Sequence, residues 1–169
     1  MGRFCLDLIV IISTKNMGTL SYKDFKLNKV FDFGYMVLSE QEIIDFATFI
    51  DPLDFHTNKE IAERGIFGAL ITSGPHLFFL FYKTHYVPLF KDTIIAGLEV
   101  NNWKFLKPVY ANMKVFCKVT IASMKPNKEK NRVTVKWHFE FLNEKDEHFQ
   151  MLDMTVLHKM TDDKKKINK

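Results

Sequence analysis

The chain has few cysteines and lacks the residue spacings that hold metals or phosphates. Cys5 and Cys117 are the only two among 169 residues, and two isolated cysteines do not form a disulfide framework. We therefore expect a reducing, cytoplasmic location. No HxxxH or CxxC spacing and no glycine-rich phosphate loop is present, and neither Ser73 nor Cys117 lies in a recognisable nucleophile motif. These absences argue against a metal centre, a phosphate-binding loop and a serine or cysteine nucleophile.

The sequence also lacks a hydrophobic run long enough to cross a membrane. Its N-terminal apolar stretch, residues 6–12, contains Asp7, is too short to span a bilayer and precedes no convincing cleavage site. The net charge is +4, and the concentrated basic run is Lys164–Lys166 with Lys169. No aromatic residues alternate with these lysines. We therefore expect a disordered, solvated tail at 161–169, and neither a nucleic acid nor a membrane as partner.

Length and composition indicate one globular domain. A chain of 169 residues with 47% hydrophobic and 14% aromatic residues can bury a sizeable core, and 17 phenylalanines are available for it. No internal repeat, low-complexity tract or linker divides the chain. We assign the domain to residues 17–160. Residues 1–16 are interpreted as an upstream extension of the reading frame or a poorly ordered strand.

Two predicted helices meet around Asp51 and His56. Residues 39–42 have the form of a capping box and start a helix that Pro52 should end, so Asp51 lies where the backbone leaves that helix. Residues 57–60 form a second capping box, which starts a short helix directly after His56. Asp51 and His56 are thus predicted to bracket a loop, and a loop can turn both side chains into one pocket.

A third helix is predicted to begin at Ser73, a plausible N-cap, with Pro75 in the first turn. Residues 77–82 are almost wholly apolar, so this helix, which we expect to extend to about His85, should be buried. Gly74 then lies at the N-terminus of the helix, next to a proline that has no backbone N–H.

Period-two hydrophobic patterns predict strands in the rest of the chain. The clearest alternation extends from Val133 to Phe141, and β-branched and aromatic residues favour a strand at Lys29–Leu38. Asn112 lies at a turn directly before another alternating segment, Met113–Ile121. Asparagine tolerates left-handed backbone geometry better than most residues. The remaining alternating segments are Ile94–Val100, Met113–Ile121 and Leu152–Val156.

The motifs around these helices resemble those of the MaoC-like acyl dehydratases, hotdog-fold proteins that include the R-specific enoyl-CoA hydratases. The family pattern is an Asp, a His five residues later, and a His-Gly or Ser-Gly pair where the central helix begins. Those positions are Asp51, His56 and Gly74 here. The resemblance covers about residues 20–157 and implies an α+β chain with one antiparallel β-sheet wrapped around a long central helix. The matching residues are Phe46-Ala47, Asp51-Pro52, Phe55-His56, Phe67-Gly68, Ser73-Gly74, His76, Trp103, Phe105, Pro108 and Val109.

The resemblance implies that the protein reversibly adds water to a 2-enoyl thioester. Asp51 and His56 would hold and activate the water, and the amide of Gly74 would stabilise the developing charge on the thioester oxygen. The substrate would be an acyl-CoA or an acyl-carrier-protein thioester, with no metal and no redox cofactor. Because hotdog subunits usually pair, a homodimer is the expected assembly.

Each of these residues also has an interpretation without catalysis. From the residues alone, Asp51 could shape a turn before proline, His56 could be an ordinary histidine before a helix cap, and Gly74 could serve close packing. Ser73 is expected to cap its helix, with substrate contact as the alternative. His76 is expected to pack or to support the site rather than to catalyse.

Two positions depart from the family pattern. Leu53 replaces the Asn or Gln that many members have two residues after the Asp, so one hydrogen bond to water or substrate is missing. Asp54 replaces the usual Pro, and a second carboxylate would raise a pKa if it were buried together with Asp51. Two alternatives therefore stay open: a hotdog acyl-CoA thioesterase, and a catalytically degenerate acyl-CoA-binding protein.

Overall fold

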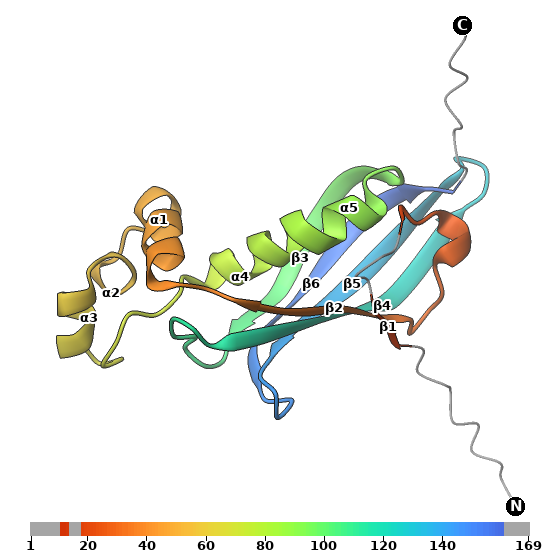
Figure 1. The fold of residues 1–169 in the computed structure, drawn as a ribbon. Helices are drawn as coiled ribbons and strands as arrows, with labels where there is room; N and C mark the ends of the chain where they lie inside the picture. Colours follow the sequence, from red (N-terminus) through yellow and green to blue (C-terminus); the bar gives the residue numbers. More distant parts are fainter. Residues whose placement is uncertain (1–10, 14–17, 161–169) are drawn as a thin grey trace, which may run out of the picture.

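The computed structural model describes residues 11–13 and 18–160 (Figure 1). In this part of the chain six strands form a single sheet in the order β1-β2-β4-β5-β6-β3. All neighbouring strands are antiparallel except β1 and β2, which are parallel. The strands are β1 (Ile11–Ser13), β2 (Val30–Val37), β3 (Ile94–Phe105), β4 (Lys114–Asn127), β5 (Arg132–Leu142) and β6 (His148–Lys159).

The two predicted terminal segments fall almost entirely outside this description. Of the N-terminal extension proposed at 1–16, only residues 11–13 are described, and they form β1 beside the first residues of β2. The basic tail at 161–169 lies wholly outside the described residues. Among the residues that are described, no helix is both long and apolar enough to cross a membrane.

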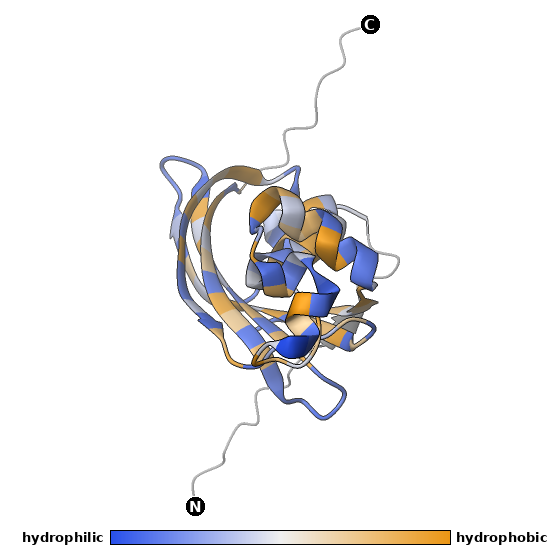
Figure 2. Ribbon diagram, turned by 90° about the vertical axis from the view of Figure 1, so that its left-hand side faces the viewer, coloured by the Kyte–Doolittle hydropathy of each residue, from blue (hydrophilic) through white to orange (hydrophobic). Residues whose placement is uncertain are grey.

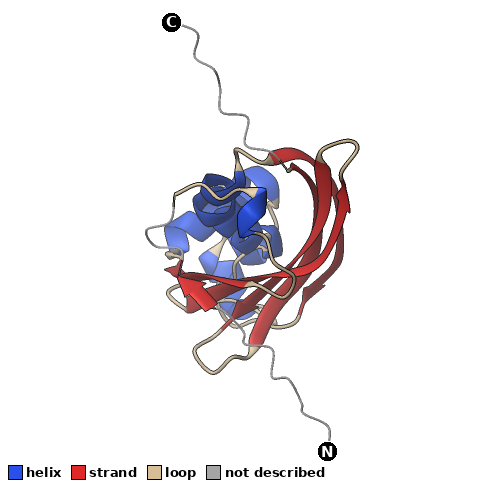
Figure 3. Cartoon of the chain, turned by 90° about the vertical axis from the view of Figure 1, so that its right-hand side faces the viewer, coloured by secondary structure: helices blue, strands red, loops and turns tan. Residues whose placement is uncertain are grey.

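A long helix lies in the concave side of the curved sheet, as Figures 1 and 3 show. It is formed by α4 (Gly74–Phe81), the π-helical turn η2 (Tyr82–Tyr86) and α5 (Val87–Phe90), which follow one another without a break. This arrangement confirms the predicted α+β hotdog fold, an antiparallel sheet wrapped around a central helix.

The central helix is longer and less completely buried than predicted. It extends to Phe90 instead of ending near His85. Because Pro88 has no N–H, the helical hydrogen-bond pattern is interrupted there, and a π turn just before it lets the helix continue. Phe79, on the side of the helix away from the sheet, is 48% exposed. The apolar run therefore buries most of the helix surface but leaves one stripe uncovered.

Three short helices lie beyond one end of the sheet (Figure 1). They are α1 (Glu40–Ile50), α2 (Asp54–Thr57) and α3 (Lys59–Arg64), and a single 3₁₀ turn, η1 (Tyr22–Asp24), precedes β2. α1 contacts both α2 and the start of α4. The segment that carries Asp51 and His56 is therefore held against the N-terminus of the central helix.

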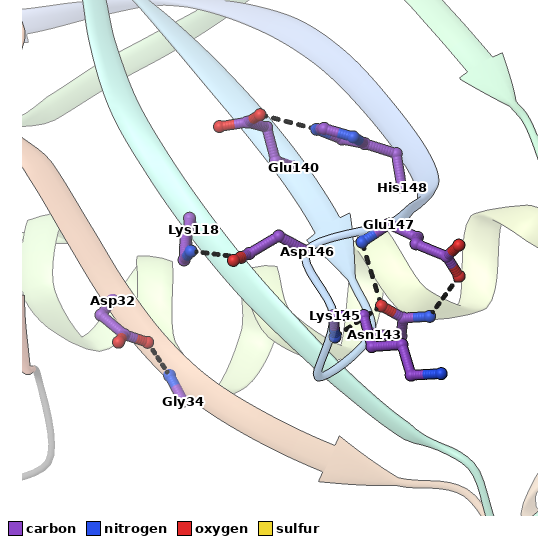
Figure 4. Close-up of polar contacts among 9 residues, drawn as sticks. All are labelled: Asp32, Gly34, Lys118, Glu140, Asn143, Lys145, Asp146, Glu147 and His148. Carbon is purple, nitrogen blue, oxygen red and sulfur yellow. Dashed lines mark hydrogen bonds and ion pairs between the residues drawn. The ribbon is translucent and has the colours of Figure 1, made fainter.

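The core lies between the central helix and the concave face of the sheet (Figure 2). The alternation predicted for β5 is confirmed, because every second side chain from Val133 to Phe141 is completely buried. The residues between them lie on the outer face, where Glu140 pairs with His148 of β6 at 2.8 Å (Figure 4). On β4, Lys118 pairs with Asp146 of the turn between β5 and β6, also at 2.8 Å. This division between apolar and polar faces explains why period two was visible in the sequence.

β3 is a strand as predicted, but its apolar residues are not buried as alternation would suggest. Leu98 is 54% exposed and Val100 is 47% exposed. β3 is the last strand in the sheet order, so in the described part of the chain no strand pairs with its outer edge. Asn112, at the turn before β4, has φ of 63°, which confirms the left-handed geometry expected there.

Candidate active site

Asp51 lies at the C-terminal end of α1, where the sequence predicted it. The predicted capping box starts this helix: the Ser39 N–H donates to the Glu42 carboxylate at 2.8 Å, and the Glu42 N–H donates to Ser39 Oγ at 3.3 Å. At the other end the Asp51 N–H still bonds to the carbonyl of Ala47, but its φ of −150° is no longer helical. Pro52 follows, so the chain turns away and Asp51 projects from the helix end.

The sequence predicted that His56 ends a loop. In the structure His56 lies instead in the one-turn helix α2. The capping box predicted at 57–60 is also wrong. Thr57 is the last residue of α2, and its hydroxyl donates back to the carbonyl of Leu53 at 3.1 Å. Asn58 caps α3 instead, accepting from the Ile61 N–H at 3.1 Å. The extra turn buries His56, which is only 5% exposed.

The carboxylate of Asp51 and the imidazole of His56 face each other. His56 Nε2 lies 3.4 Å from Asp51 Oδ2, and His56 Nδ1 lies 2.8 Å from the carbonyl oxygen of Ile71. A carbonyl oxygen can only accept, so Nδ1 carries a proton and donates it. In the neutral imidazole Nε2 is then an acceptor, directed toward another acceptor. The pair is therefore arranged to receive protons from a third group placed between them.

Ser73 supports this pair rather than its own helix. No side-chain capping bond forms at the start of α4. The hydroxyl of Ser73, which is completely buried, donates instead to Asp51 Oδ2 at 2.7 Å. Ser73 is the N-cap residue of α4, as predicted, but its side chain accepts no N–H from the helix. The hydroxyl proton, which a capping bond does not use, goes to the Asp51 carboxylate, a strong charged acceptor.

Gly74 is the first residue of α4, and its backbone N–H has no acceptor within the helix. The positive end of the helix dipole adds to the attraction of this N–H for negative charge. A side chain at this position would overlap the ring of Phe105, so glycine allows that ring to pack closely here. Pro75 follows without an N–H, which leaves the amide of Gly74 as the donor at this edge of the pocket.

One buried polar residue in contact with Gly74 was not identified from the sequence. Gln150 is 2% exposed, and its side chain bonds to the Gly74 carbonyl and the Trp103 indole. A signal was present: Gln150 has the same period-two position as the inward-facing Leu152 and Met154, and a glutamine among such residues needs hydrogen-bond partners.

These groups surround a pocket of about 450 Å³ at the N-terminus of the central helix. Asp51, His56 and Gly74 all line it, so the structure brings together the three residues that the resemblance selected. Lys107 lies at its rim, half-exposed and 3.4 Å from Glu147. Most of the remaining wall is apolar, and it includes Phe67, Ile71, Leu77, Leu106, Pro108 and Phe149.

His76, Leu53 and Asp54 do not line this pocket. The His76 ring stacks on Phe46 with 4.1 Å between ring centres, and burial lowers its pKa to about 4. Its position matches the expected packing role. Leu53 is 47% exposed, and its backbone carbonyl accepts from the His56 N–H. Asp54 is exposed, so the two carboxylates are not buried together.

The described residues contain no group of three or more His, Cys, Asp or Glu side chains placed to hold a metal ion. Cys117, on the inner face of β4, is a free buried thiol, and burial raises its pKa well above the usual value. The polar groups that line the pocket include the Asp51 carboxylate, the His56 imidazole and the helix N-terminus at Gly74. Together they can bind water, move a proton and stabilise an oxyanion.

Comparison with known proteins places this chain in a family. The model of the MaoC-like domain matches residues 24–140. The uncharacterized protein YdeM of Bacillus subtilis is 31% identical over 106 residues, which cover 62% of this chain and 75% of that protein. The MaoC-like dehydratase from Rhodospirillum rubrum superimposes with a TM-score of 0.73 at 25% identity, over 84% of this chain and 98% of that one. The R-hydratase PhaJ1 from Pseudomonas aeruginosa has the same fold, with a TM-score of 0.68 at 17% identity over 85% and 88% of the two chains. The chain belongs to the MaoC-like domain family.

Proposed function

We propose that this protein is a hydratase and dehydratase that reversibly adds water to the double bond of a 2-enoyl thioester. The observation that carries the proposal is the meeting of Asp51, His56 and the N–H of Gly74 at one pocket with mainly apolar walls. The reaction needs a base for water, a proton for the α-carbon and a donor for the thioester oxygen. This pocket offers a group for each of these tasks.

The dyad suits a bound water molecule. His56 Nε2 and Asp51 Oδ2 are two acceptors 3.4 Å apart, and the Ser73 hydroxyl donates to the same carboxylate oxygen. A water that donates one proton to each member of the dyad would satisfy both. Its oxygen lone pairs would then be directed away from the dyad, toward a substrate carbon in the pocket.

Gly74 would act on the other end of the reacting system. As water attacks the β-carbon, electrons move through the double bond and negative charge develops on the thioester oxygen. The amide at the start of α4 would donate to that oxygen, and the helix dipole adds to its effect. The apolar wall around it strengthens this interaction because water competes less for the oxyanion.

The proton balance closes within the dyad. One of its two groups takes a proton from water as the oxygen bonds to the β-carbon. The proton returns to the α-carbon as the enolate collapses, so hydration leaves Asp51 and His56 in their starting states. The reverse sequence removes water from a 3-hydroxyacyl thioester. No metal or redox cofactor enters these steps, and the thioester belongs to coenzyme A or to an acyl-carrier protein.

We also propose that the protein is a cytoplasmic homodimer. The outer edge of β3 is unpaired in the described part of the chain, and the exposed side chains of Ile95, Leu98 and Val100 line it. A second copy would pair with this edge and cover these residues. The free thiol of Cys117 fits a reducing compartment. Sedimentation should give a dimer mass, and Leu98→Lys should shift it toward a monomer.

Loss of enoyl absorbance from crotonyl-CoA tests the proposed reaction. The wild type should consume the substrate and form the 3-hydroxy product, whereas Asp51→Asn and His56→Ala should not. Asp54→Asn is the matched control, because this exposed carboxylate does not line the pocket and its loss should leave the rate unchanged. Release of free CoA would instead establish a thioesterase. Binding of short, long and branched enoyl-CoAs without turnover would mark a protein that only binds acyl-CoA.

A further inference from the structure

We propose that Gln150 is a positioning residue that, held by Trp103, fixes Gly74 so that its N–H is directed into the pocket. This inference rests on the proposed function, in which Gly74 donates to the thioester oxygen. Gln150 lies near the start of β6, and Trp103 lies near the end of β3, the two strands that pair with each other at this edge of the sheet. Neither residue has a role in the dyad itself.

The hydrogen bonds of Gln150 fix the orientation of its side-chain amide. Its oxygen accepts from Trp103 Nε1 at 2.7 Å, and its nitrogen donates to the Gly74 carbonyl oxygen at 2.9 Å. An indole N–H can only donate and a carbonyl oxygen can only accept, so the opposite orientation would leave both bonds unmade. The three residues therefore form a directed chain from the indole through the amide to the first residue of α4.

Two β-bulges aim these side chains at Gly74. On β3, the register with β6 shifts between Asn101 and Lys104, and Asn102 takes a left-handed φ of 52°. On β6, the register with β5 shifts just before Gln150. Each bulge adds one residue to its strand, and bulges re-aim the side chains beside them. Phe149 and Gln150 are consequently both buried, although they are consecutive in a strand.

Gly74 needs such external support. Any side chain here would force the ring of Phe105 to move, and glycine itself has no side chain to restrict its own backbone. A hydrogen bond to its carbonyl fixes the 74–75 peptide plane and so restrains the first turn of α4, from which the Gly74 N–H projects. An amide held in advance toward the developing oxyanion stabilises the transition state without reorganising during the reaction.

Hydrogen-bonding partners are also what make Gln150 tolerable in this environment. Its side chain lies on the inner face of the sheet and lines the pocket, among apolar residues. An unpaired amide there would lose its hydrogen bonds to water without replacing them, whereas an apolar residue would avoid that cost. The side-chain amide of Gln150 therefore has a hydrogen-bond partner for its oxygen and one for its nitrogen. The second partner is the carbonyl of Gly74, the residue whose N–H is the proposed oxyanion donor.

Steady-state kinetics of the full chain on crotonyl-CoA test the proposal. Gln150→Met keeps the length of the side chain and removes both bonds, and Trp103→Phe removes the indole N–H together with one ring while keeping an aromatic side chain. Each should lower kcat by about 10- to 100-fold, because misplacing a catalytic group by about 1 Å has effects of this size. KM should change by less than about 3-fold, as expected for an interaction that acts only in the transition state.

The control and the double variant separate positioning from general damage. Gln41→Met makes the same chemical change on the exposed surface of α1 and should have no effect. Gln150→Met combined with Trp103→Phe should be no slower than the slower single variant, because both substitutions break one chain of bonds. Additive losses would overturn the proposal, as would a raised KM with unchanged kcat, which would mean that Gln150 binds substrate directly. If Gln150→Met fails to fold, Trp103→Phe still decides.

A measurement without substrate keeps this inference distinct from the proposed reaction. The ¹H–¹⁵N signal of the Gly74 amide should shift in both Gln150→Met and Trp103→Phe and stay in place in Gln41→Met. An unmoved signal would refute the positioning role. If the wild type hydrated no enoyl thioester but the signal shifted as expected, the proposed function would fail while the coupling between Gln150 and Gly74 would stand.

Discussion

His56 and His158 lie at opposite ends of the central helix and resemble each other in burial and in the hydrogen bond of one ring nitrogen. Both are almost completely buried, with 5% and 0% of their surface exposed. In each, Nδ1 is hydrogen-bonded to an oxygen: the carbonyl of Ile71 at 2.8 Å for His56, and the hydroxyl of Thr93 at 2.9 Å for His158. The Thr93 hydroxyl gives its own proton to a carbonyl, so it accepts from the imidazole. The same tautomer is therefore present at both ends.

The two histidines differ in the partners of their second ring nitrogen, Nε2. Nε2 of His158 accepts from the Trp137 indole at 3.2 Å and lies 3.4 Å from the Tyr86 hydroxyl, both neutral groups. Burial lowers the pKa of His158 to about 4, and no carboxylate among the described residues offsets this effect. Nε2 of His56 instead faces the carboxylate of Asp51 at the pocket. The partner of the second nitrogen thus decides whether a buried histidine joins helix to sheet or can carry a proton.

The sharpest way to break this comparison is to remove the imidazole of His56. His56→Gln should lower the hydration rate by about 10²- to 10⁴-fold, the usual contribution of a general acid or base, and change the midpoint of thermal unfolding little. Crotonyl-CoA rates and thermal unfolding check both. His138→Gln is the matched control, since His138 pairs with Asp153 on the outer face of the sheet. A His56→Gln variant that folds and keeps the wild-type rate would remove His56 from the mechanism.

The opposite outcome is expected at the other end of the helix. His158→Leu removes the acceptor of the Trp137 N–H and the partner of the Tyr86 hydroxyl, both buried. Each orphaned group costs about 1–3 kcal/mol, so the free energy of unfolding should fall by about 2–5 kcal/mol. Urea unfolding measures this change, and the rate per folded molecule should stay near that of the wild type. Full stability in the variant would show that these bonds contribute little.

The lowered pKa of His158 predicts acid sensitivity. An exposed histidine in the unfolded chain gains a proton below about pH 6.5, whereas His158 in the folded protein stays neutral down to about pH 4. Since the unfolded state binds the extra proton in this window, the free energy of unfolding falls as the pH falls through it, by about 3 kcal/mol for such a shift. His76, whose pKa is also lowered to about 4 by burial, acts in the same direction.

Denaturant unfolding at several pH values between about 7 and 4.5 measures this dependence. His158→Gln removes the titrating group and should make the free energy of unfolding depend less on pH, even if the variant is less stable throughout. His138→Gln, made in the exposed pair on the outer face, again serves as the control. A slope unchanged by His158→Gln would show that other groups account for the acid sensitivity.

The parts of the fold that were predicted correctly are those in which neighbouring residues carry the signal. The alternation in β5 and the capping box at 39–42 depend on contacts within a few residues, and both are confirmed. The alternation at Ile94–Val100 predicted a strand but not its exposure, because an edge position is a property of the whole sheet. The π turn at Tyr82–Tyr86 likewise reflects how one proline is accommodated in a packed helix.

The site shows the same limit. Spacing and resemblance selected Asp51, His56 and Gly74, and the structure brings them to one pocket. The bonds that hold them come from distant segments and could not be read locally. Gln150 reaches Gly74 from the last strand, and the Ser73 hydroxyl bonds to a carboxylate 22 residues earlier instead of its own helix. Local propensity identified Ser73 as the N-cap residue, but it could not show that the hydroxyl donates to a carboxylate that only the fold brings near.

Ser73 offers the smallest and most specific test of the contrast between the two ends. Ser73→Ala removes the proton given to Asp51 Oδ2 but no atom that would contact the substrate water directly. The carboxylate then loses one restraint on its orientation, and we expect the hydration rate to fall by about 10-fold, equivalent to about 1.4 kcal/mol, as for the loss of one hydrogen bond to a charged group. Thr93→Ala, which removes the hydroxyl beside His158, should lower stability and leave the rate unchanged. Equal rates in Ser73→Ala and the wild type would show that His56 and the end of α1 orient Asp51 without help from this hydroxyl.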